Sequence, residues 1–370
     1  MAVSERPTWQ EAKRILCVRL DGMGDVLMTA PALRALKDSI PGREITLLTS
    51  PAGAAVAEML TEVDDVMEYD APWVKGDGRR LSASRDRRMI AELRMRRFDA
   101  AVVFTVSTQN PAPAAMLCHL AEIPLRLAYG REKIYDLVTD RVPDVPTTWD
   151  QPHEVRRQLD LVAAVGARTA DERLSLRIPP WARWRARLRL RGSGLDPSRP
   201  WVAVHPGASA PSRRYPPGSF SAAAELLSAQ GLQVLFTGDP SEHPLVEQIR
   251  SRVRAPTWSL AGQLTVPEIA AVIAEAPVFA SNNTGPAHIA TAVGTPVVVL
   301  YAQTNPQHTP WGGTSRVLTN PVPCRNCLHS TCPLGHHACL RAVAPERVAE
   351  AVLELSDPSR TEAAFASTPA

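Results

Sequence analysis

The sequence predicts an α/β protein with two doubly wound domains. Short runs of β-branched residues alternate with helical stretches, which is typical of parallel α/β sheets. This alternation occurs twice, before and after a linker region at residues 168–200 that contains two adjacent prolines and an Arg/Trp-rich helix. A chain of 370 residues is long enough for two domains. We therefore expect one domain over residues 1–180, a second over 181–355 and a disordered tail over 356–370.

The first half opens with a strand at Arg14–Leu20 (RILCVRL), which is apolar enough to be buried on both faces of a sheet. A glycine turn follows, and then an apolar helix from about Val26 to Ser39. The other elements predicted in this half are, in order, the strand Glu44–Thr49, the helix Ala52–Leu60, the strand Ala100–Thr105 and the helix Val155–Val165.

The second half repeats the pattern. Its predicted strands are Trp201–Val204, Leu232–Phe236, Val278–Ala280 and Pro296–Leu300. Its predicted helices are Gly218–Ala229, Leu245–Val253, Val266–Ala276, a short helix beginning near Gly285 and Pro345–Leu355. Doubly wound domains bind ligands at the carboxyl ends of their strands, so the loops that follow the strands are where site residues are expected.

Composition narrows the class of protein. A hydrophobic fraction of 45% and a charged fraction of 21% suit a soluble globular protein. Lys and Arg (41) exceed Asp and Glu (38) too slightly to indicate binding of nucleic acid. The sequence contains no apolar run long enough to span a membrane, and Met1–Ile15 lacks the apolar core of a signal peptide. These features predict a cytoplasmic protein.

The first candidate motif is LDGMGDV at residues 20–26, between a strand and a helix. Its glycines allow a tight turn and a close approach to a ligand. It is not a dinucleotide-binding fingerprint, because the third glycine is absent. Asp25 is a candidate functional carboxylate, or it only caps the helix. Asp21 could equally be a solvent-facing turn residue.

Two further motifs follow strands of the second half. The loop at residues 205–217 (HPGASAPSRRYPP) carries two arginines whose forked donors suit a diphosphate. The motif SNNTGPAH at residues 281–288 predicts the end of a strand, a polar turn and the start of a helix, which favours an anion. Alternatively, the arginines are solvated, Thr284 or Asn283 caps the helix, and His288 is a core histidine. The position of both motifs at strand ends of one domain favours the functional interpretation.

Four cysteines crowd together near the end of the chain, at Cys324, Cys327, Cys332 and Cys339. With His329, His336 and His337 nearby they could ligate zinc, but they lack the pattern of two separated pairs that is common in zinc folds. We favour buried thiols that hold a C-terminal loop, and we predict no metal.

Together these stretches resemble glycosyltransferase family 9, the heptosyltransferases that build the inner core of lipopolysaccharide. The resemblance runs from about Arg14 to Val352 and depends on RLDGMGDVLMTAPALRAL, HPGASAPSRRYPP, TGDPSE and NNTGPAHIATAVGTPVVVLY occurring in this order. It implies the GT-B fold, in which two Rossmann-like domains face each other across a cleft. The donor would bind the C-terminal domain and the acceptor mainly the N-terminal one. The cysteine-rich stretch resembles the heptosyltransferase II branch, which argues against a special metal role.

The resemblance also implies roles for single residues. Asp25 would be the general base that removes the proton of the acceptor hydroxyl while its oxygen attacks the anomeric carbon and inverts it, and Gly22, Met23 and Gly24 would lie on the acceptor side. The donor would be bound by phosphate contacts, by a ribose-binding acid and by a residue against adenine. Ser209 and Arg213 match the phosphate-binding loop, and Thr284 and Gly285 match phosphate contacts at a helix start. Glu242 matches the ribose-binding acid and Leu264 the residue against adenine. The other donor-binding positions are Arg214, Asn283, Pro286 and His288. No cofactor or divalent metal is implied.

The implied function is transfer of a heptose, or a related sugar, from an ADP-sugar to a hydroxyl of a glycolipid acceptor in inner-core biosynthesis. Asn283 stands where the family usually has aspartate, and Arg213 where lysine is common, so ADP-heptose is the leading donor. One alternative is the same chemistry on a soluble acceptor such as an aminocyclitol. Another is a catalytically silent nucleotide-sugar binder. The basic segment Arg79–Arg97 could contact a phosphorylated lipid at the inner membrane face, or be a solvated helix, which we favour.

Overall fold

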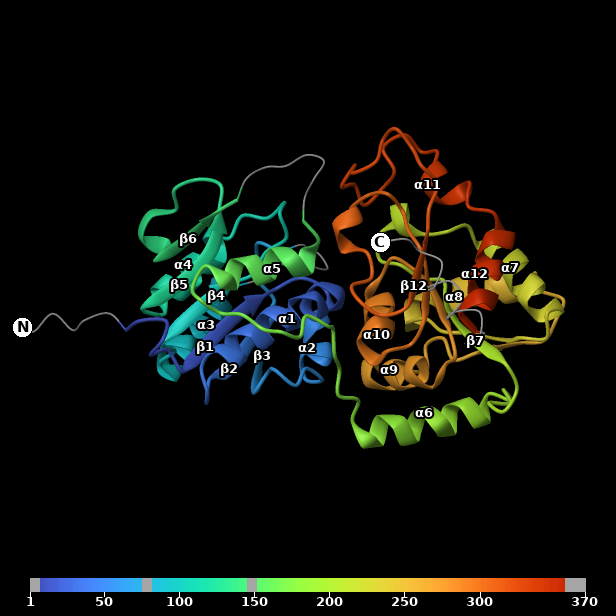
Figure 1. Ribbon diagram of the computed structural model, residues 1–370, viewed down its shortest axis with the longest axis horizontal. Coiled ribbons are helices and arrows are strands. Elements are labelled where there is room, and N and C mark those ends of the chain that lie inside the picture. The colour runs from blue at the N-terminus through green and yellow to red at the C-terminus, as the bar shows by residue number, and fades with distance from the viewer. Residues whose placement is uncertain (1–6, 75–81, 145–151, 357–370) are drawn as a thin grey trace, which may run out of the picture. The chain divides into compact units, whose positions relative to one another are not determined.

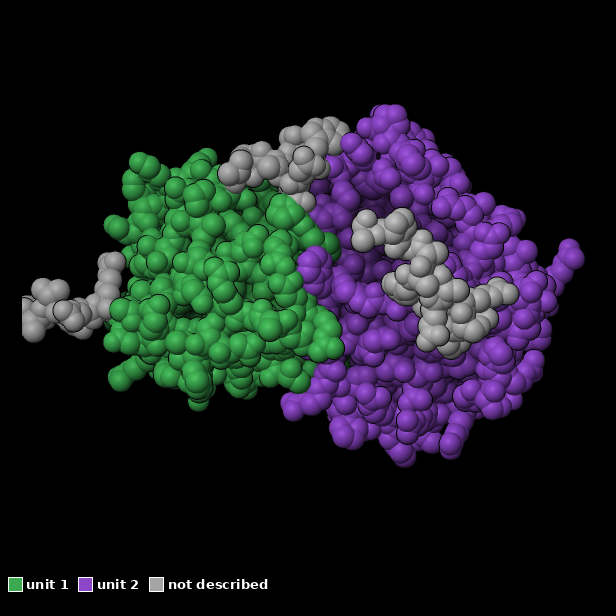
Figure 2. All heavy atoms as spheres, viewed as in Figure 1, with its two compact units in different colours: residues 1–173 green, residues 174–370 purple. Residues whose placement is uncertain are grey.

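The computed structural model describes residues 7–74, 82–144 and 152–356. The chain divides into two compact units, residues 1–173 (unit 1) and residues 174–370 (unit 2), which Figure 2 shows in different colours. The sequence predicts a boundary at residue 180, and the residues between the two positions have no regular structure. Of the predicted tail, residues 357–370 lie outside the described part of the chain, whereas Ser356 ends a helix.

Unit 1 is built on a six-stranded sheet with the order β3-β2-β1-β4-β5-β6, in which every described pair is parallel (Figure 1). Its strands are β1 (Arg14–Arg19), β2 (Glu44–Thr49), β3 (Asp65–Glu68), β4 (Ala100–Val103), β5 (Leu125–Gly130) and β6 (Asp140–Pro143). The chain winds outward from β1 in one direction and then from β4 in the other. The switch point of this sheet therefore lies between β1 and β4.

Helices cover both faces of the unit 1 sheet. They are α1 (Met23–Ser39), α2 (Pro51–Ala57), α3 (Ala83–Arg96), α4 (Ala112–Leu120) and α5 (Glu154–Ala163). Helix α1 contacts α2 and α5, whereas α3 contacts α4. Leu16 and Val18 of β1 share a core with Leu93 of α3 and Cys118 of α4. Successive strand side chains point to opposite faces, so the intervening Cys17, which is also fully buried, belongs to the other layer.

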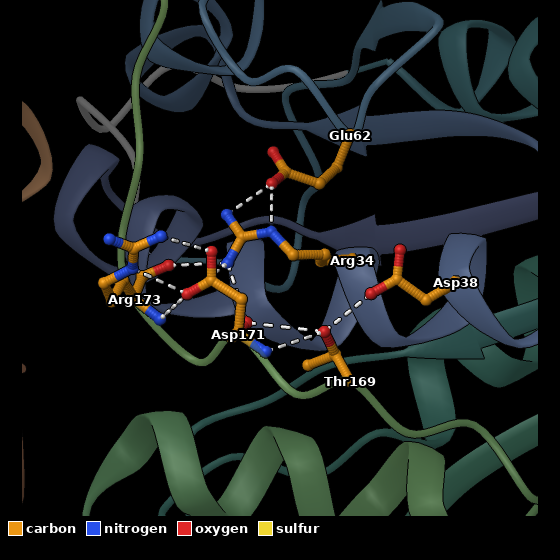
Figure 3. Close-up of polar contacts among 6 residues, drawn as sticks. All are labelled: Arg34, Asp38, Glu62, Thr169, Asp171 and Arg173. Atoms are coloured by element: carbon orange, nitrogen blue, oxygen red, sulfur yellow. Dashed lines mark hydrogen bonds and ion pairs between the residues drawn. The ribbon is translucent and has the colours of Figure 1, made fainter.

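The end of unit 1 is fastened along α1, as Figure 3 shows. Arg34 of α1 donates to the carboxylate of Glu62 at 2.6 and 2.9 Å and to two backbone carbonyls of the segment 169–173, both at 2.8 Å. Thr169 donates to Asp38, near the end of α1, at 2.6 Å. These contacts keep the segment that leads out of unit 1 against the helix that begins at the LDGMGDV motif.

Unit 2 repeats the architecture with the sheet order β12-β11-β10-β7-β8-β9, again parallel in every described pair (Figure 1). Its strands are β7 (Trp201–His205), β8 (Gln233–Phe236), β9 (Thr257–Ser259), β10 (Phe279–Asn282), β11 (Val297–Leu300) and β12 (Ser315–Leu318). The switch point lies between β7 and β10. The predicted fold class, two doubly wound parallel sheets, is confirmed.

The helices of unit 2 form two groups. They are α6 (Pro180–Gly192), α7 (Pro217–Ala229), α8 (His243–Arg250), α9 (Val266–Glu275), α10 (Gly285–Val293), α11 (Ala338–Arg341) and α12 (Pro345–Ser356). Helix α7 contacts α8 and α12, whereas α9 contacts α6 and α10. Val202 and Val204 of β7 share a core with Phe220 of α7, Ile249 of α8 and Val352 of α12. Within the described ranges, no helix has the length and apolar character needed to cross a bilayer.

Candidate active site

All three predicted motifs lie at the switch points of the two sheets. In unit 1, the LDGMGDV motif follows β1, next to the loop 104–111 that follows β4. In unit 2, the loop 206–216 follows β7 and the short turn 283–284 follows β10. Because ligands of doubly wound sheets bind where the strand order reverses, both places are candidate sites.

Asp25 lies in the first turn of α1, three residues after the N-cap position. The N-cap residue is Gly22, so Asp25 is not the N-cap residue, although its carboxylate lies in the first turn, where it suits the helix dipole. The side chain of Asp25 is 23% exposed, and its Oδ1 lies 3.3 Å from Nη2 of Arg19. Gly22, Met23 and Gly24 are also at least partly exposed, whereas the helix is buried from Val26 to Leu33. The predicted acceptor-side residues thus form an accessible turn.

Asp21 is not a solvent-facing turn residue, contrary to the interpretation left open above. Its side chain is only 10% exposed and forms an ion pair with Nε of Arg19 at 2.9 Å. Gln109, from the loop after β4, donates to Asp21 Oδ1, and Ser50 donates to its backbone carbonyl at 2.7 Å. Asp21 therefore joins the loops that follow β1 and β4.

Arg19 connects these acidic groups, and sequence reasoning missed it. It is fully buried at the end of β1 and forms a third ion pair, at 2.9 Å, with Glu154 of α5, which is itself 1% exposed. Burial by itself lowers the pKa of Arg19, but Asp21, Glu154 and Asp25 outweigh burial and hold the pKa above its ordinary value. A charged residue in a strand expected to be buried on both faces was the available signal, because a buried charge needs partners.

A cavity of about 230 Å³ opens beside this cluster in unit 1. It is lined by polar residues of the loops after β4 and β5, among them Gln109, Asn110 and Arg131. Gln109 belongs to both features, since it lines the cavity and contacts Asp21. Arg131 forms an ion pair with Asp144 at 3.4 Å on the cavity wall.

In unit 2, Asn282 fastens the loop after β7 to the end of β10. This fully buried side chain accepts from the amide of Tyr215 at 3.0 Å and donates to the carbonyl of Pro206 at 2.7 Å. Both ends of the predicted phosphate loop are thereby fixed. Ser209 is exposed on the loop, and Arg214 donates through Nε to the carbonyl of Ala208 at 2.7 Å.

Unpaired donors gather where this loop meets the start of α10. Within the described residues, Arg213 Nε is buried without a hydrogen-bond partner, and Asn283 Nδ2 makes no hydrogen bond of ordinary geometry. Both side chains lie near the Tyr301 hydroxyl: burial raises the pKa of Tyr301, and Arg213 and Asn283 act in the opposite direction. Thr284, the N-cap residue of α10, makes no side-chain cap, so the Thr284 capping alternative is wrong.

The start of α10 holds the remaining donor-binding residues predicted from the SNNTGPAH motif. Thr284 and Gly285 are partly exposed, whereas Pro286 and His288 are buried. A helix start without a side-chain cap leaves backbone N–H groups available to an anion. The position next to Arg213 therefore suits a phosphate group.

Glu242 is held between the loop after β7 and the turn after β8. Its carboxylate accepts from the amide of Asp239 at 2.9 Å and lies 3.4 Å from His205 Nε2. Burial raises the pKa of Glu242, but these contacts outweigh burial and hold the pKa below its ordinary value. A Cβ atom on Gly207 would lie 1.8 Å from this carboxylate, so any other residue there would displace the Glu242 side chain from its observed position. The ribose-binding role of Glu242, and the adenine contact of the partly exposed Leu264, stay predictions.

The four C-terminal cysteines line one small cavity together with His336 and His337. All four are free thiols and are only partly buried, so the expectation of buried thiols is wrong in that respect. Cys324 Sγ lies 3.8 Å from His336 Nε2. In the part of the chain that the structure describes, no three His, Cys, Asp or Glu side chains are arranged to hold a metal ion. The absence of a metal stays a prediction.

Comparison with known proteins gives consistent matches. Residues 87–338 match the model of the family described as Glycosyltransferase family 9 (heptosyltransferase). Lipopolysaccharide heptosyltransferase 2 of Salmonella typhimurium is 26% identical over 349 residues, which cover 91% of this chain and 97% of that protein.

Two solved structures share the fold over both units. The glycosyl transferase family 9 structure from Veillonella parvula has a TM-score of 0.78 at 20% identity and covers 95% of this chain and 98% of its own. The E. coli ADP-heptose lps heptosyltransferase II has a TM-score of 0.73 at 23% identity and covers 93% and 98%. The pair of Rossmann-like domains expected from the resemblance is confirmed.

Proposed function

The chain belongs to glycosyltransferase family 9, and we propose that it transfers a heptose from ADP-heptose to a hydroxyl group of a lipopolysaccharide core acceptor. A relative that matches nearly the whole chain is named as a lipopolysaccharide heptosyltransferase, and one of the similar structures is named for ADP-heptose. We further propose that the configuration of the anomeric carbon is inverted, since a single base and a stabilised leaving group suffice for a direct displacement.

The contacts of the loops at the switch point of unit 2 are the main observation that supports this proposal. Arg213 Nε and Asn283 Nδ2 lack ordinary hydrogen-bond partners within the described residues, and α10 begins without a side-chain cap. A nucleoside diphosphate would supply acceptor oxygens to all three, and the same groups would stabilise its charge as it leaves. A metal ion is not needed in this scheme, because the arginine and the helix start neutralise the diphosphate.

Asp25 is the proposed base in unit 1. Its carboxylate would accept the proton of the acceptor hydroxyl as the new bond forms between that oxygen and the anomeric carbon. The bond from the anomeric carbon to the phosphate oxygen breaks in the same step and releases ADP. A partly exposed carboxylate at the start of α1 suits this role, because the acceptor must reach it.

The acceptor would be bound by the cavity of unit 1. Its lining offers amide groups from Gln109 and Asn110 and a guanidinium from Arg131, which suit sugar hydroxyls and an anionic substituent. Gln109 also contacts Asp21, so an acceptor in the cavity would lie beside the loop that precedes Asp25.

The arginines of α3 do not favour contact with a membrane. Arg85, Arg94 and Arg96 of this helix form ion pairs with acidic residues of unit 1, as a solvated helix would. Residues 79–81 of the basic segment lie outside the described part of the chain. The cytoplasmic location stays a prediction.

A donor survey with product detection tests the function. The purified protein would be incubated with ADP-heptose, or with other nucleotide sugars, in the presence of core glycolipid that lacks its outer heptose. We expect mass spectrometry to show one added heptose and release of ADP with ADP-heptose only. If the protein transferred heptose to a soluble aminocyclitol but not to the glycolipid, the proposed acceptor would be wrong. If no combination of donor and acceptor gave a product, the assignment as a transferase would be refuted.

A further inference from the structure

The buried arginine at the end of β1 has more acidic partners than its burial requires. Arg19 is fully buried, and Asp21 and Glu154 already pair with it at 2.9 Å each. The third carboxylate, Asp25, is 23% exposed and belongs to the candidate site. Its contact with Arg19 is therefore not needed to keep a buried charge paired.

A single nitrogen atom of Arg19 joins the buried and the exposed part of this cluster. Nη2 lies 2.9 Å from Glu154 Oε1 and 3.3 Å from Asp25 Oδ1. Glu154 is oriented in turn by Gln158, which donates to Oε1 at 2.7 Å and to the carbonyl of Thr105 at 3.1 Å. Glu154 and Gln158 are each no more than 1% exposed, so the chain of contacts is fixed by packing.

We propose that Arg19 and Glu154 are positioning residues for Asp25, with Glu154 holding Nη2 of Arg19 and Nη2 holding one oxygen of the Asp25 carboxylate. The inference rests on the proposed role of Asp25 as the base. Neither residue touches the substrate in this scheme. They act by keeping the proton acceptor where the acceptor hydroxyl must meet it, since a misplacement of about 1 Å can cost about 100-fold in rate.

Three carboxylates around Arg19 also suit a reaction in which one of them, Asp25, becomes protonated. When Asp25 takes up a proton, it ceases to be an anionic partner of Arg19. Asp21 and Glu154 remain, so the buried guanidinium keeps two anionic partners throughout the reaction. A pair made of Arg19 and Asp25 alone would leave a buried cation without an anion at that moment, which is costly.

The competing explanation is a structural clamp between β1 and α5. A clamp would contribute to stability whatever the state of Asp25. A purely structural role does not account for all of Arg19, because its Nη1 atom is buried and has no hydrogen-bond partner within the described residues. The two explanations differ in one measurable way: positioning requires Asp25, and clamping does not.

A double-mutant cycle separates them. Glu154→Gln keeps the shape of the side chain and removes its charge, and we expect kcat to fall by about 10- to 100-fold while the donor Kd is unchanged. In an Asp25→Asn background, measured in single turnover at high enzyme concentration, the same substitution should cause no further loss. The matched control is Glu62→Gln, another buried glutamate paired with an arginine in unit 1, which should lower Tm and leave kcat unchanged.

Arg19→Lys provides an independent test if Glu154→Gln folds poorly. Lysine keeps the charge but presents a single nitrogen, so kcat should fall with the donor Kd again unchanged. A wild-type kcat in folded Glu154→Gln would contradict the positioning role and support the structural clamp. So would a fall in kcat that is equally large with Asp25 and with Asn at position 25. Wild-type transfer by Asp25→Asn would instead refute the proposed base, a separate outcome.

Discussion

The Nδ2 atom of Asn282 lies 2.7 Å from the backbone carbonyl of Pro206, so the last residue of β10 is bonded to the first residue of the loop after β7. The same side chain accepts from the amide of Tyr215, which lies near the other end of that loop. One buried amide therefore fixes the loop that carries Arg213 relative to the start of α10.

Replacement of this amide should loosen the donor site. Asn282→Ala leaves two buried backbone groups without their partner, at about 1–3 kcal/mol for each group. We expect a lower Tm and weaker binding of ADP, measured by thermal unfolding and calorimetry. Asn320→Ala, which removes long hydrogen bonds near the surface of the same unit, is the control and should leave ADP binding unchanged. Wild-type affinity for ADP in folded Asn282→Ala would show that the loop needs no such anchor.

Arg213 should bind the diphosphate rather than the nucleoside. Arg213→Ala removes a charge-assisted hydrogen bond, worth roughly 1.5–3 kcal/mol, so the affinity for ADP should fall far more than the affinity for adenosine. Calorimetry with both ligands measures the difference. Arg214→Ala is the comparison and should cost less, because the Arg214 Nε is already bonded to the Ala208 carbonyl. Equal losses for ADP and adenosine in Arg213→Ala would exclude contact with the phosphates.

Asn283 should influence the choice of donor. Its Nδ2 is buried beside the proposed phosphate position, and Asn283→Asp would exchange that donor for a negative charge. We expect the ratio of kcat/KM between ADP-heptose and another nucleotide sugar to change. An unchanged ratio would mean that the residue does not contact the donor. Activity that appears only in Asn283→Asp would support the silent-binder alternative.

Removal of metals should leave the enzyme active. The diphosphate is neutralised by Arg213 and the start of α10 in the proposed scheme, and the four cysteines are expected to be structural thiols. Treatment with a strong chelator should change neither Tm nor transfer. Elemental analysis is the control: about one zinc per chain in freshly purified protein, lost together with stability, would contradict this prediction.

Much of the fold could be predicted because the central strands are buried on both faces. β1 and β2 are apolar runs, and both were found within one residue of their observed ends. The edge strands escaped prediction, and so did the interior strand β5, although β5 is buried along its whole length. β3 begins and ends with an acidic residue, and all three residues of β9 are partly exposed, so neither produces an apolar run in the sequence.

The site divides in the same way. Loops after β1, β7 and β10 could be predicted because their glycines, arginines and polar turns are local features of the sequence. The contacts that hold those loops are not local. Glu154 lies 135 positions from Arg19, and Asn282 lies 76 positions from Pro206. Pairings over such separations follow from the strand order of the sheets, and that order was not predicted from the sequence.

The rate of heptose transfer by Asp25→Ala tests directly whether Asp25 is the base. Loss of a general base costs about 10²–10⁴ in rate, so transfer from ADP-heptose should fall by that factor while calorimetry shows wild-type affinity for ADP. Asp38→Ala, an exposed aspartate near the other end of α1, is the matched control and should transfer at the wild-type rate. A folded Asp25→Ala protein that transfers heptose at nearly the wild-type rate would contradict the assignment of Asp25 as the base.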